Sequence, residues 1–294
     1  MKKAVIRTAL ALAALLVMLL VWGVAVEPRL ILDQRRESAP IPGLPQAWAG
    51  SEVAFFSDLQ VGMWWSNEAM VERIVEQTIE EDPDVVVLGG DFVYSASPNV
   101  AQQVETVVDL LRPLLDAGLP TFAVLGNHDH HAGAAVELEI ALEDMGITVL
   151  QNEAVVLPTP QNDTEGDGDL HLAGLAATRP GLTDVQTALA HVPDQASRMV
   201  FMHNPTAFPE LPAGSAPLAA AGHTHCGQIA LPGSPGWSYM GLTQEEKVVV
   251  DGWAPSSYGA DGNRLFVSCG IGFSIVPMRI NAAPQLVVFE LTPG

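Results

Sequence analysis

Residues 122–129 read FAVLGNHD, an apolar run that leads through one glycine into three polar side chains that can bind metals. Two stretches upstream follow the same plan: residues 53–57 end at Asp58, and residues 84–88 lead through two glycines to Asp91. Short apolar runs of this kind are typical of buried strands. Because sites in open α/β sheets form at the carboxyl ends of strands, we expect these polar groups to converge.

Stretches with helical spacing separate these strands. Residues 71–79, 100–117 and 134–145 place apolar side chains three and four apart, which predicts helices. The alternation predicts an α/β sheet with crossover helices. Shorter β-like pieces later in the chain predict a second sheet; they cover residues 154–157, 170–173, 199–202, 247–250, 265–268 and 286–291. Residues 161–168, rich in Asp and Gly, favour a solvated hairpin tip over a calcium loop.

Two further polar clusters lie in the second half of the chain. His203 follows the run 199–202, and Gly222-His223-Thr224-His225 places two imidazoles two residues apart. Carboxylates, imidazoles and an amide together suit Mn, Fe or Zn better than an all-oxygen site for Ca or Mg. One such histidine beside a strand is more often structural than a ligand. The joint order of five motifs, each at a strand end, favours a metal site.

Length and composition indicate one globular domain. The chain has 294 residues, of which 48% are hydrophobic, and a net charge of −21. Such a charge opposes broad attraction to nucleic acid, so no nucleic-acid partner is expected, and it also suits a well-solvated surface. Cys226 and Cys269 are the only cysteines. They form no disulfide framework, although a single bridge between them stays open.

The N-terminus has the length and polarity of a membrane span. Residues 8–26 are almost uncharged and apolar, after Lys2, Lys3 and Arg7. We expect residues 1–26 to be a signal anchor, with a cleaved signal peptide as the alternative. The preceding charges favour an extracytoplasmic domain, although arginines after the run weaken that bias. Residues 27–50 are then a linker and residues 51–294 the catalytic domain.

The five motifs resemble, in order, those of the calcineurin-like metallophosphoesterase superfamily: Asp-x-His, Gly-Asp, Gly-Asn-His-Asp/Glu, His and Gly-His-x-His. The resemblance runs from Val53 to the end of the sequence. Residues 222–228 and 276–279 are similar to a membrane-associated branch that includes UDP-2,3-diacylglucosamine pyrophosphatases of lipid A synthesis. The resemblance to the superfamily implies a hydrolase with the metallo-dependent phosphatase fold, a four-layer αββα sandwich of two mixed β-sheets flanked by helices.

The resemblance also implies a role for each motif residue. Asp91 would bridge two divalent metal ions, which would activate a water for attack on phosphorus. His128 would donate a proton or stabilise charge at the substrate phosphate, and Asp129 would orient its ring. Outside the five motifs, we expect Arg279 to contact a substrate phosphate, with a structural salt bridge as the alternative. The first ion would be held by Asp58, Gln60 and His225, and the second by Asn127, His203 and His223.

The first motif departs from the family pattern, because Gln60 stands where the family has histidine. A neutral amide oxygen is a poorer ligand for Zn or Fe, so the first ion should bind more weakly or be a harder ion. Cys226 is expected to be a packed thiol, with a third soft ligand as the alternative. Residues 63–65, Met-Trp-Trp, form either a loop cover or an apolar lip for an acyl chain.

Together these features predict a membrane-anchored, metal-dependent phosphoesterase that cleaves a phosphoester or pyrophosphate bond. A lipid-linked or nucleotide-lipid substrate is expected because an anchor would hold the site near the bilayer. The alternative is a catalytically weakened metal-binding scaffold that uses the same fold to bind a partner. The sequence does not determine the oligomeric state.

Overall fold

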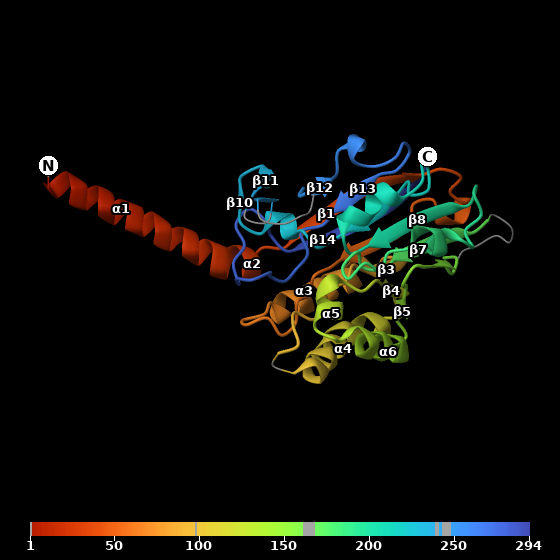
Figure 1. The fold of residues 1–294 in the computed structure, drawn as a ribbon, viewed down its shortest axis with the longest axis horizontal. Helices are drawn as coiled ribbons and strands as arrows, with labels where there is room; N and C mark the ends of the chain where they lie inside the picture. Colours follow the sequence, from red (N-terminus) through yellow and green to blue (C-terminus); the bar gives the residue numbers. More distant parts are fainter. Residues whose placement is uncertain (1, 98, 161–167, 239–240, 243–247) are drawn as a thin grey trace.

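The computed structural model describes residues 2–97, 99–160, 168–238, 241–242 and 248–294. Two six-stranded mixed sheets pack face to face, and helices lie on their outer faces (Figure 1). The predicted four-layer αββα sandwich is therefore confirmed. A short hairpin, β10 (Ala230–Leu231) with β11 (Ser234–Ser238), lies outside both sheets.

The first sheet contains the strands that carry the first three motifs. Its strands, in spatial order, are β1 (Asp33–Ile41), β14 (Gln285–Pro293), β2 (Glu52–Phe56), β3 (Val85–Leu88), β4 (Thr121–Ala123) and β5 (Thr148–Val149). Strands β2 to β5 are mutually parallel, whereas β14 runs antiparallel to β2. The carboxyl ends of β2, β3 and β4 therefore lie side by side.

The second sheet carries the two later motifs. Its strands, in spatial order, are β12 (Gly252–Trp253), β13 (Leu265–Val267), β9 (Ala219–Ala221), β8 (Ser197–Met202), β7 (Leu170–Leu175) and β6 (Glu153–Val156). Strands β7, β8, β9 and β13 are parallel, so the motif residues after β8 and β9 leave the sheet at one edge.

Alternating side chains of β2 show how the layers are held together. Val53 and Phe55 point into the core between the two sheets, while Ala54 and Phe56 point into the core under the helices. Both faces of the strand are thus buried, which explains its continuous apolar sequence. A third core lies between the second sheet, a short helix and a 3-10 segment.

Helices cover the first sheet where their spacing predicts. They are α3 (Glu68–Glu81), α4 (Val100–Asp116) and α6 (Ala135–Met145), with the short α5 (Asn127–His131) before α6. The second sheet has a thinner cover of α7 (Val185–Leu189) and the 3-10 segment η3 (Pro205–Glu210). Short 3-10 turns also occur at η2 (Gln46–Trp48), η4 (His225–Gly227) and η5 (Ser256–Tyr258).

Two β-like pieces differ from expectation. Residues 286–291 belong to β14, which lies in the first sheet rather than the second, because its two buried faces suit a position between β1 and β2. Residues 248–250 are not in a strand, and residue 247 lies outside the described part of the chain. The predicted hairpin tip at 161–168 also falls outside it, except for its last residue.

The segment 27–50, expected to be a linker, instead joins the first sheet. Strand β1 pairs in parallel with β14 from Asp33 to Ile41. Its polar sequence conceals this role, since β1 is an edge strand whose charged side chains face outward and pair with neighbours. Arg35 bonds to Asp33 and Asp251, and Arg36 bonds to Glu52 and Glu81.

The N-terminal helix leaves the body along its long axis (Figure 1). Helix α1 (Lys2–Val21) has no buried residue, and it continues through the π-helical turn η1 (Trp22–Val26) into α2 (Glu27–Leu30). The continuous helix Lys2–Leu30 contains an 18-residue stretch with a mean hydropathy of 2.7, which suits a membrane span and also suits a signal sequence. Among the described residues, burial against the domain occurs at the base of this helix, at Gly23, Glu27 and Pro28.

Cys226 and Cys269 form a disulfide, so the expectation of a packed thiol at Cys226 is wrong. The bond joins the loop after β9 to the loop after β13. These cysteines lie far apart in the sequence, and only the pairing of β9 with β13 brings the two loops together.

Candidate active site

The loops after five strands bring most of the sequence-predicted ligands together. Asp58, Asp91 and Asn127 follow β2, β3 and β4, while His203 and the pair His223/His225 follow β8 and β9. Ligand atoms of Asp91, His203 and His223 all lie within 4.8 Å of one another. The two sheets therefore meet at one polar centre.

Asp91 lies at the middle of this centre and is almost fully buried. Its Oδ1 accepts the backbone N–H of His128 at 2.8 Å, and its Oδ2 accepts Gln60 Nε2 at 2.8 Å. His203 Nε2 lies 3.2 Å from the same Oδ2. A Cβ on Gly126 would come within 2.1 Å of Asp91 Oδ1, so the approach of these two loops requires glycine.

Asp58 faces the same space from β2. Ser57 Oγ donates to Asp58 Oδ2 at 2.6 Å, and the backbone N–H of His223 donates to the same oxygen at 3.1 Å. His225 Nε2 lies 3.7 Å from Asp58 Oδ1. A Cβ on Gly222 would approach Asp58 Oδ2 to 2.5 Å, which explains the glycine before the His-x-His motif.

Five of the seven predicted metal ligands have left-handed backbone conformations, with φ between 47° and 70°. They are Asp58, Gln60, Asp91, His223 and His225. Non-glycine residues rarely adopt such angles, which cost about 1–3 kcal/mol each and persist only where the surrounding structure imposes them. This concentration of backbone strain is typical of a functional site.

Burial and charge shift the pKa values of the central groups. Burial raises the pKa of Asp58. Burial also acts to raise the pKa of Asp91, but the charges of His203 and His128 outweigh it and hold that pKa below its usual value. Burial acts to lower the pKa of His203, yet the Asp91 carboxylate raises it to about 10. A bound cation would replace the proton on His203, because a metal ligand must be deprotonated.

Hydrogen bonds hold the side chains of His203 and Asn127 in position. His203 Nδ1 pairs with the carbonyl oxygen of Gly89 at 2.8 Å, which turns Nε2 toward Asp91. Asn127 Oδ1 accepts Asn204 Nδ2 at 3.2 Å, and Asn204 Oδ1 accepts the backbone N–H of Thr178 at 3.1 Å. Asn204 thus orients Asn127, a role that its position inside the His-Asn-Pro motif did not reveal.

Asp129 does not orient the ring of His128 as expected. Its carboxylate accepts the backbone N–H groups of Gly126, Asp91 and Val93, which caps α5 and ties two strand-end loops together. Burial, followed by the charge of Asp91, raises the pKa of Asp129 to about 7. Its role is structural.

Tyr94 orients His128 instead. His128 Nδ1 pairs with the Tyr94 carbonyl oxygen at 2.6 Å, and the two rings stack with centroids 5.1 Å apart. The sequence reasoning missed Tyr94 because a backbone carbonyl and a ring face leave no residue signature. His128 itself is half-buried.

Arg279 is fully buried, so the expected contact with a substrate phosphate does not match its position. Its guanidinium donates to the carbonyl oxygens of Gly272, Cys269 and Ala282. Arg279 Nη2 also lies 3.1 Å from His225 Nδ1. Burial, and then this cation, hold the pKa of His225 well below its usual value.

The residues present fit divalent cations. Gln60 Oε1 is buried without a hydrogen-bond partner, although buried polar atoms are nearly always paired. His203 Nε2 is also buried, and at 3.2 Å from Asp91 Oδ2 it lacks the geometry of a hydrogen bond. Both atoms belong to the predicted ligand set. Carboxylate, imidazole and amide donors in one buried cluster suit Mn, Fe or Zn.

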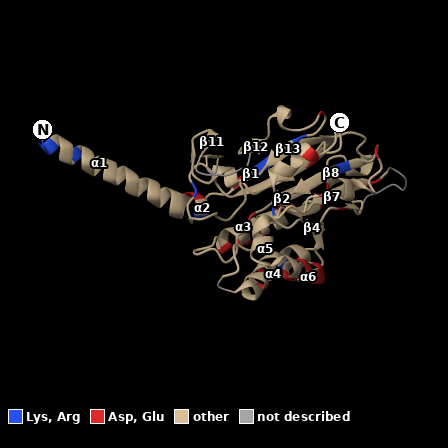
Figure 2. Ribbon diagram, viewed as in Figure 1, with Lys and Arg blue, Asp and Glu red and all other residues tan. Residues whose placement is uncertain are grey.

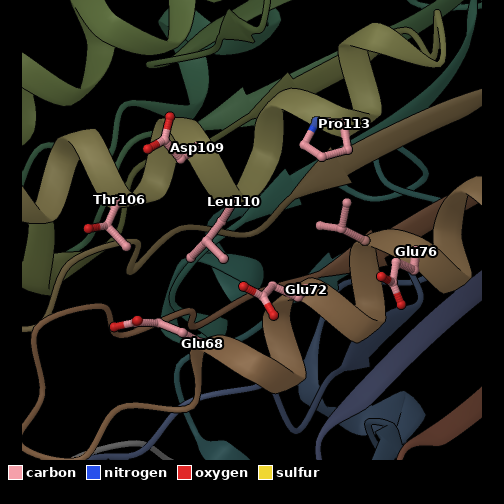
Figure 3. Close-up of a pocket in the computed structure, with 8 residues that line it drawn as sticks. Glu68, Glu72, Glu76, Thr106, Asp109, Leu110 and Pro113 are labelled. Carbon is pink, nitrogen blue, oxygen red and sulfur yellow. The ribbon is translucent and has the colours of Figure 1, made fainter.

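A groove elsewhere on the surface is not part of this centre. It has a volume of about 370 Å³ between α3 and α4, and Figure 3 shows acidic side chains along it. Glu68, Glu72 and Glu76 line it from α3, and Asp109 lines it from α4. Carboxylates without a cation repel a phosphate, so this groove is a poor phosphate site.

The fold and the buried centre define a metal-dependent phosphoester hydrolase. The chain belongs to the calcineurin-like phosphoesterase family, whose sequence profile matches residues 51–227. Proteins of this family bind divalent metals. Because the family consists of phosphoesterases, the chain is a hydrolase.

Several known proteins are similar to this chain. Phosphodiesterase YaeI of Escherichia coli (strain K12) is 32% identical over 248 residues, which cover 82% of each chain. The uncharacterized metallophosphoesterase YkuE of Bacillus subtilis is 26% identical over 84% of this chain and 81% of its own. A transmembrane protein with metallophosphoesterase domain from Danio rerio is 27% identical over 91% of this chain and 59% of its own.

Among solved structures, a dimetal phosphatase from Danio rerio is similar with a TM-score of 0.49 and 13% identity. The match covers 83% of this chain and 93% of that one.

Proposed function

We propose that the chain is a membrane-anchored phosphodiesterase that uses two divalent ions. The observation that carries this proposal is the cluster of Asp91, His203 and His223, whose ligand atoms lie within 4.8 Å of one another beside His128. Asp91 would bridge the ions, with Asp58, Gln60 and His225 on one side and Asn127, His203 and His223 on the other. Such ions, when bound, polarise phosphoryl oxygens and lower the pKa of a coordinated water.

The protein side chains would bind and orient the phosphoryl group. Tyr94 fixes His128 through Nδ1, so Nε2 would face the leaving oxygen and donate a proton to it. Asp129 and Gly126 hold the loop that carries His128 against Asp91. The ring would thus be positioned before substrate arrives.

Two observations support the substrate class. The 32% identical relative is named a phosphodiesterase, which favours a diester or pyrophosphate over a monoester. The base of the apolar N-terminal helix contacts the loop that holds Arg279, since the Arg279 N–H donates to the Gly23 carbonyl oxygen. A site so close to a membrane span suits a lipid-linked or nucleotide-lipid phosphate.

The disulfide supports an extracytoplasmic domain. Disulfides persist in oxidising compartments and are rare in the cytosol. The bond between Cys226 and Cys269, together with the basic residues before the apolar run, favours a single-pass anchor with the domain outside.

A scaffold without turnover is the second candidate. One observation favours it: Gln60 donates to Asp91 Oδ2, so the amide hydrogen faces the proposed bridging oxygen. In that case the domain would bind metal and a partner without hydrolysis.

Metal add-back distinguishes these candidates. The full chain in lipid nanodiscs would be stripped of metal and assayed with a chromogenic phosphodiester after addition of Mn, Zn, Mg or Ca. We expect metal-dependent turnover, and a fall in kcat of about 10²- to 10⁴-fold in His128→Ala with bound metal unchanged. The exposed His131→Ala is the matched control. Metal binding without turnover for any of the four ions would support the scaffold.

A further inference from the structure

Four large apolar side chains are exposed at the tips of two loops. Trp64 and Trp65 follow β2 and are 63% and 57% exposed, and Ile275 and Val276 lie between β13 and β14 at 46% and 38%. Trp64 Nε1 donates to the carbonyl oxygen of Ile275 at 3.4 Å, so the two loops meet. We call these four residues the apolar tip. Neighbouring apolar side chains left in water require an explanation.

The apolar tip lies at the base of the N-terminal helix. Arg29 donates to the Trp65 carbonyl oxygen at 2.8 Å, and its guanidinium lies 4.6 Å from the centre of the Trp65 ring. The Arg279 N–H donates to the Gly23 carbonyl oxygen at 2.8 Å, and Gly23 packs against Met278 and Ile280. Both loops therefore touch the segment in which the apolar run ends.

This contact sets the level of the apolar tip relative to a bilayer. Gly23 belongs to the apolar run 8–26, so the loop that packs on it reaches the depth at which the span leaves the membrane. Helix α1 runs away from the body on this side (Figure 1), and a bilayer crossed by it would face both loops. Tryptophan is enriched at that depth because its ring is apolar and its N–H is polar.

We infer that the apolar tip inserts into the interface of the same bilayer that α1 crosses. The inference rests on the proposed membrane anchor. The domain would then be held at two places, by the span and by the tip, and would have a fixed orientation on the membrane.

The two loops carry few acidic residues, which is compatible with contact with a bilayer. The chain holds 34 acidic residues, yet residues 57–67 contain only the buried Asp58 and residues 268–284 contain none. Acidic side chains instead gather on elements such as α6 (Figure 2). An otherwise acidic protein thus presents a face that anionic headgroups would not repel.

Docking of the tip would place the active site at the level of lipid phosphates. The backbone N–H of Ile275 donates to Tyr94 Oη at 3.3 Å, and Tyr94 stacks on His128. Tyr94 thus connects His128 directly to the inserted loop. A phosphoryl group in the headgroup layer could reach it while the acyl chains stay in the membrane.

Depth-dependent quenching tests the inference directly. Both native cysteines are in the disulfide, so an introduced cysteine is a unique thiol for an environment-sensitive fluorophore. Trp64→Cys and Val276→Cys would be labelled in the full chain and placed in nanodiscs that contain nitroxide-labelled phosphatidylcholine. Leu15→Cys in α1 reports the anchor, and Val136→Cys, 70% exposed on α6, reports the far surface.

We expect quenching at 15, 64 and 276 but not at 136. Quenching at 15 alone would overturn the docking while the anchor stands. No quenching at any of the four positions would overturn the anchor and the docking together. These readings do not depend on turnover, so a failure of the proposed hydrolysis stays distinguishable.

A kinetic comparison separates docking from a local role. In the double variant Trp64→Ser/Val276→Ser, turnover of the soluble chromogenic diester should stay within about 2-fold. Turnover of a lipid-linked pyrophosphate in the same discs should fall at least ~10-fold, since the loss of two apolar side chains that would enter the bilayer weakens insertion. Equal falls with both substrates, or no fall with either, would contradict the inference.

Discussion

The two halves of the proposed metal centre share Asp91 but are built differently. The second half, Asn127 with His203 and His223, brings its histidines against Asp91 and fixes His203 through the Gly89 carbonyl oxygen. The first half has a neutral amide at Gln60, and its amide hydrogen faces Asp91. Its histidine, His225, lies 3.1 Å from the Arg279 cation and 3.7 Å from Asp58.

From this difference we predict that the two proposed ions would not be equivalent. An imidazole held against a carboxylate binds Mn, Fe or Zn well, whereas a neutral amide and a nearby cation both disfavour them. We therefore expect the second half to fill first as metal is added. The first half should fill only at higher metal concentration, or with a harder ion.

The largest effect is expected from Asp91→Asn, because this residue belongs to both halves. We expect kcat/KM to fall by at least ~10³-fold and both ions to be lost, since a bridging anion cannot be replaced by an amide. Metal content by elemental analysis and turnover of the chromogenic diester would check this. The exposed Asp109→Asn on α4 should change neither value. Retention of both ions in Asp91→Asn would refute a shared ligand.

The next largest effect is expected from Arg279→Met. Arg279 contacts His225 in the first half of the metal centre, and its loss should lower the stability of the folded protein. Its guanidinium is buried among three carbonyl oxygens that would lose their donors. We expect the free energy of unfolding to fall by about 3–5 kcal/mol, as when a buried charge network is broken. Denaturant unfolding would measure it, with the exposed Arg73→Met as control. A change below about 1 kcal/mol would show that Arg279 has little structural importance.

The smallest effect is expected from Gln60→His, which makes the first half more like the second. An added imidazole should tighten the weaker ion by about 10-fold, in the range that changes around a metal produce. Calorimetric titration of the metal-free protein would resolve the two ions. Gln102→His, on the exposed face of α4, controls for a surface histidine. Unchanged binding in Gln60→His would mean that Gln60 is not a ligand.

The sequence predicted which of the candidate ligands come together, because polar side chains and strand ends coincide. Residues 122–129 show the transition from apolar strand to polar loop that recurs at Asp58, Asp91 and His203, and parallel strands place such ends together. The helices of the first sheet followed from their spacing. Each of these patterns involves residues that are close together in the chain, so a single sequence is enough to recognise it.

Features that depend on distant partners were not predictable. Strand β1 looks like a polar linker because only its pairing with β14 makes it a strand. Tyr94 acts through a carbonyl oxygen, and Arg279 looks like a phosphate ligand until its burial is known. The disulfide stayed open as a possibility, since the two loops meet only through the second sheet.

The position of β14 has a consequence for how the protein matures. This strand lies between β1 and β2, yet the ribosome makes it long after both. Until then the first sheet lacks the strand that joins β1 to β2, and β2, which leads to Asp58, keeps an unpaired edge. Non-local pairing of this kind slows folding and leaves strand edges open to aggregation. If the proposed anchor enters the membrane first, the domain would remain incompletely folded at the membrane surface until its C-terminal strand is made.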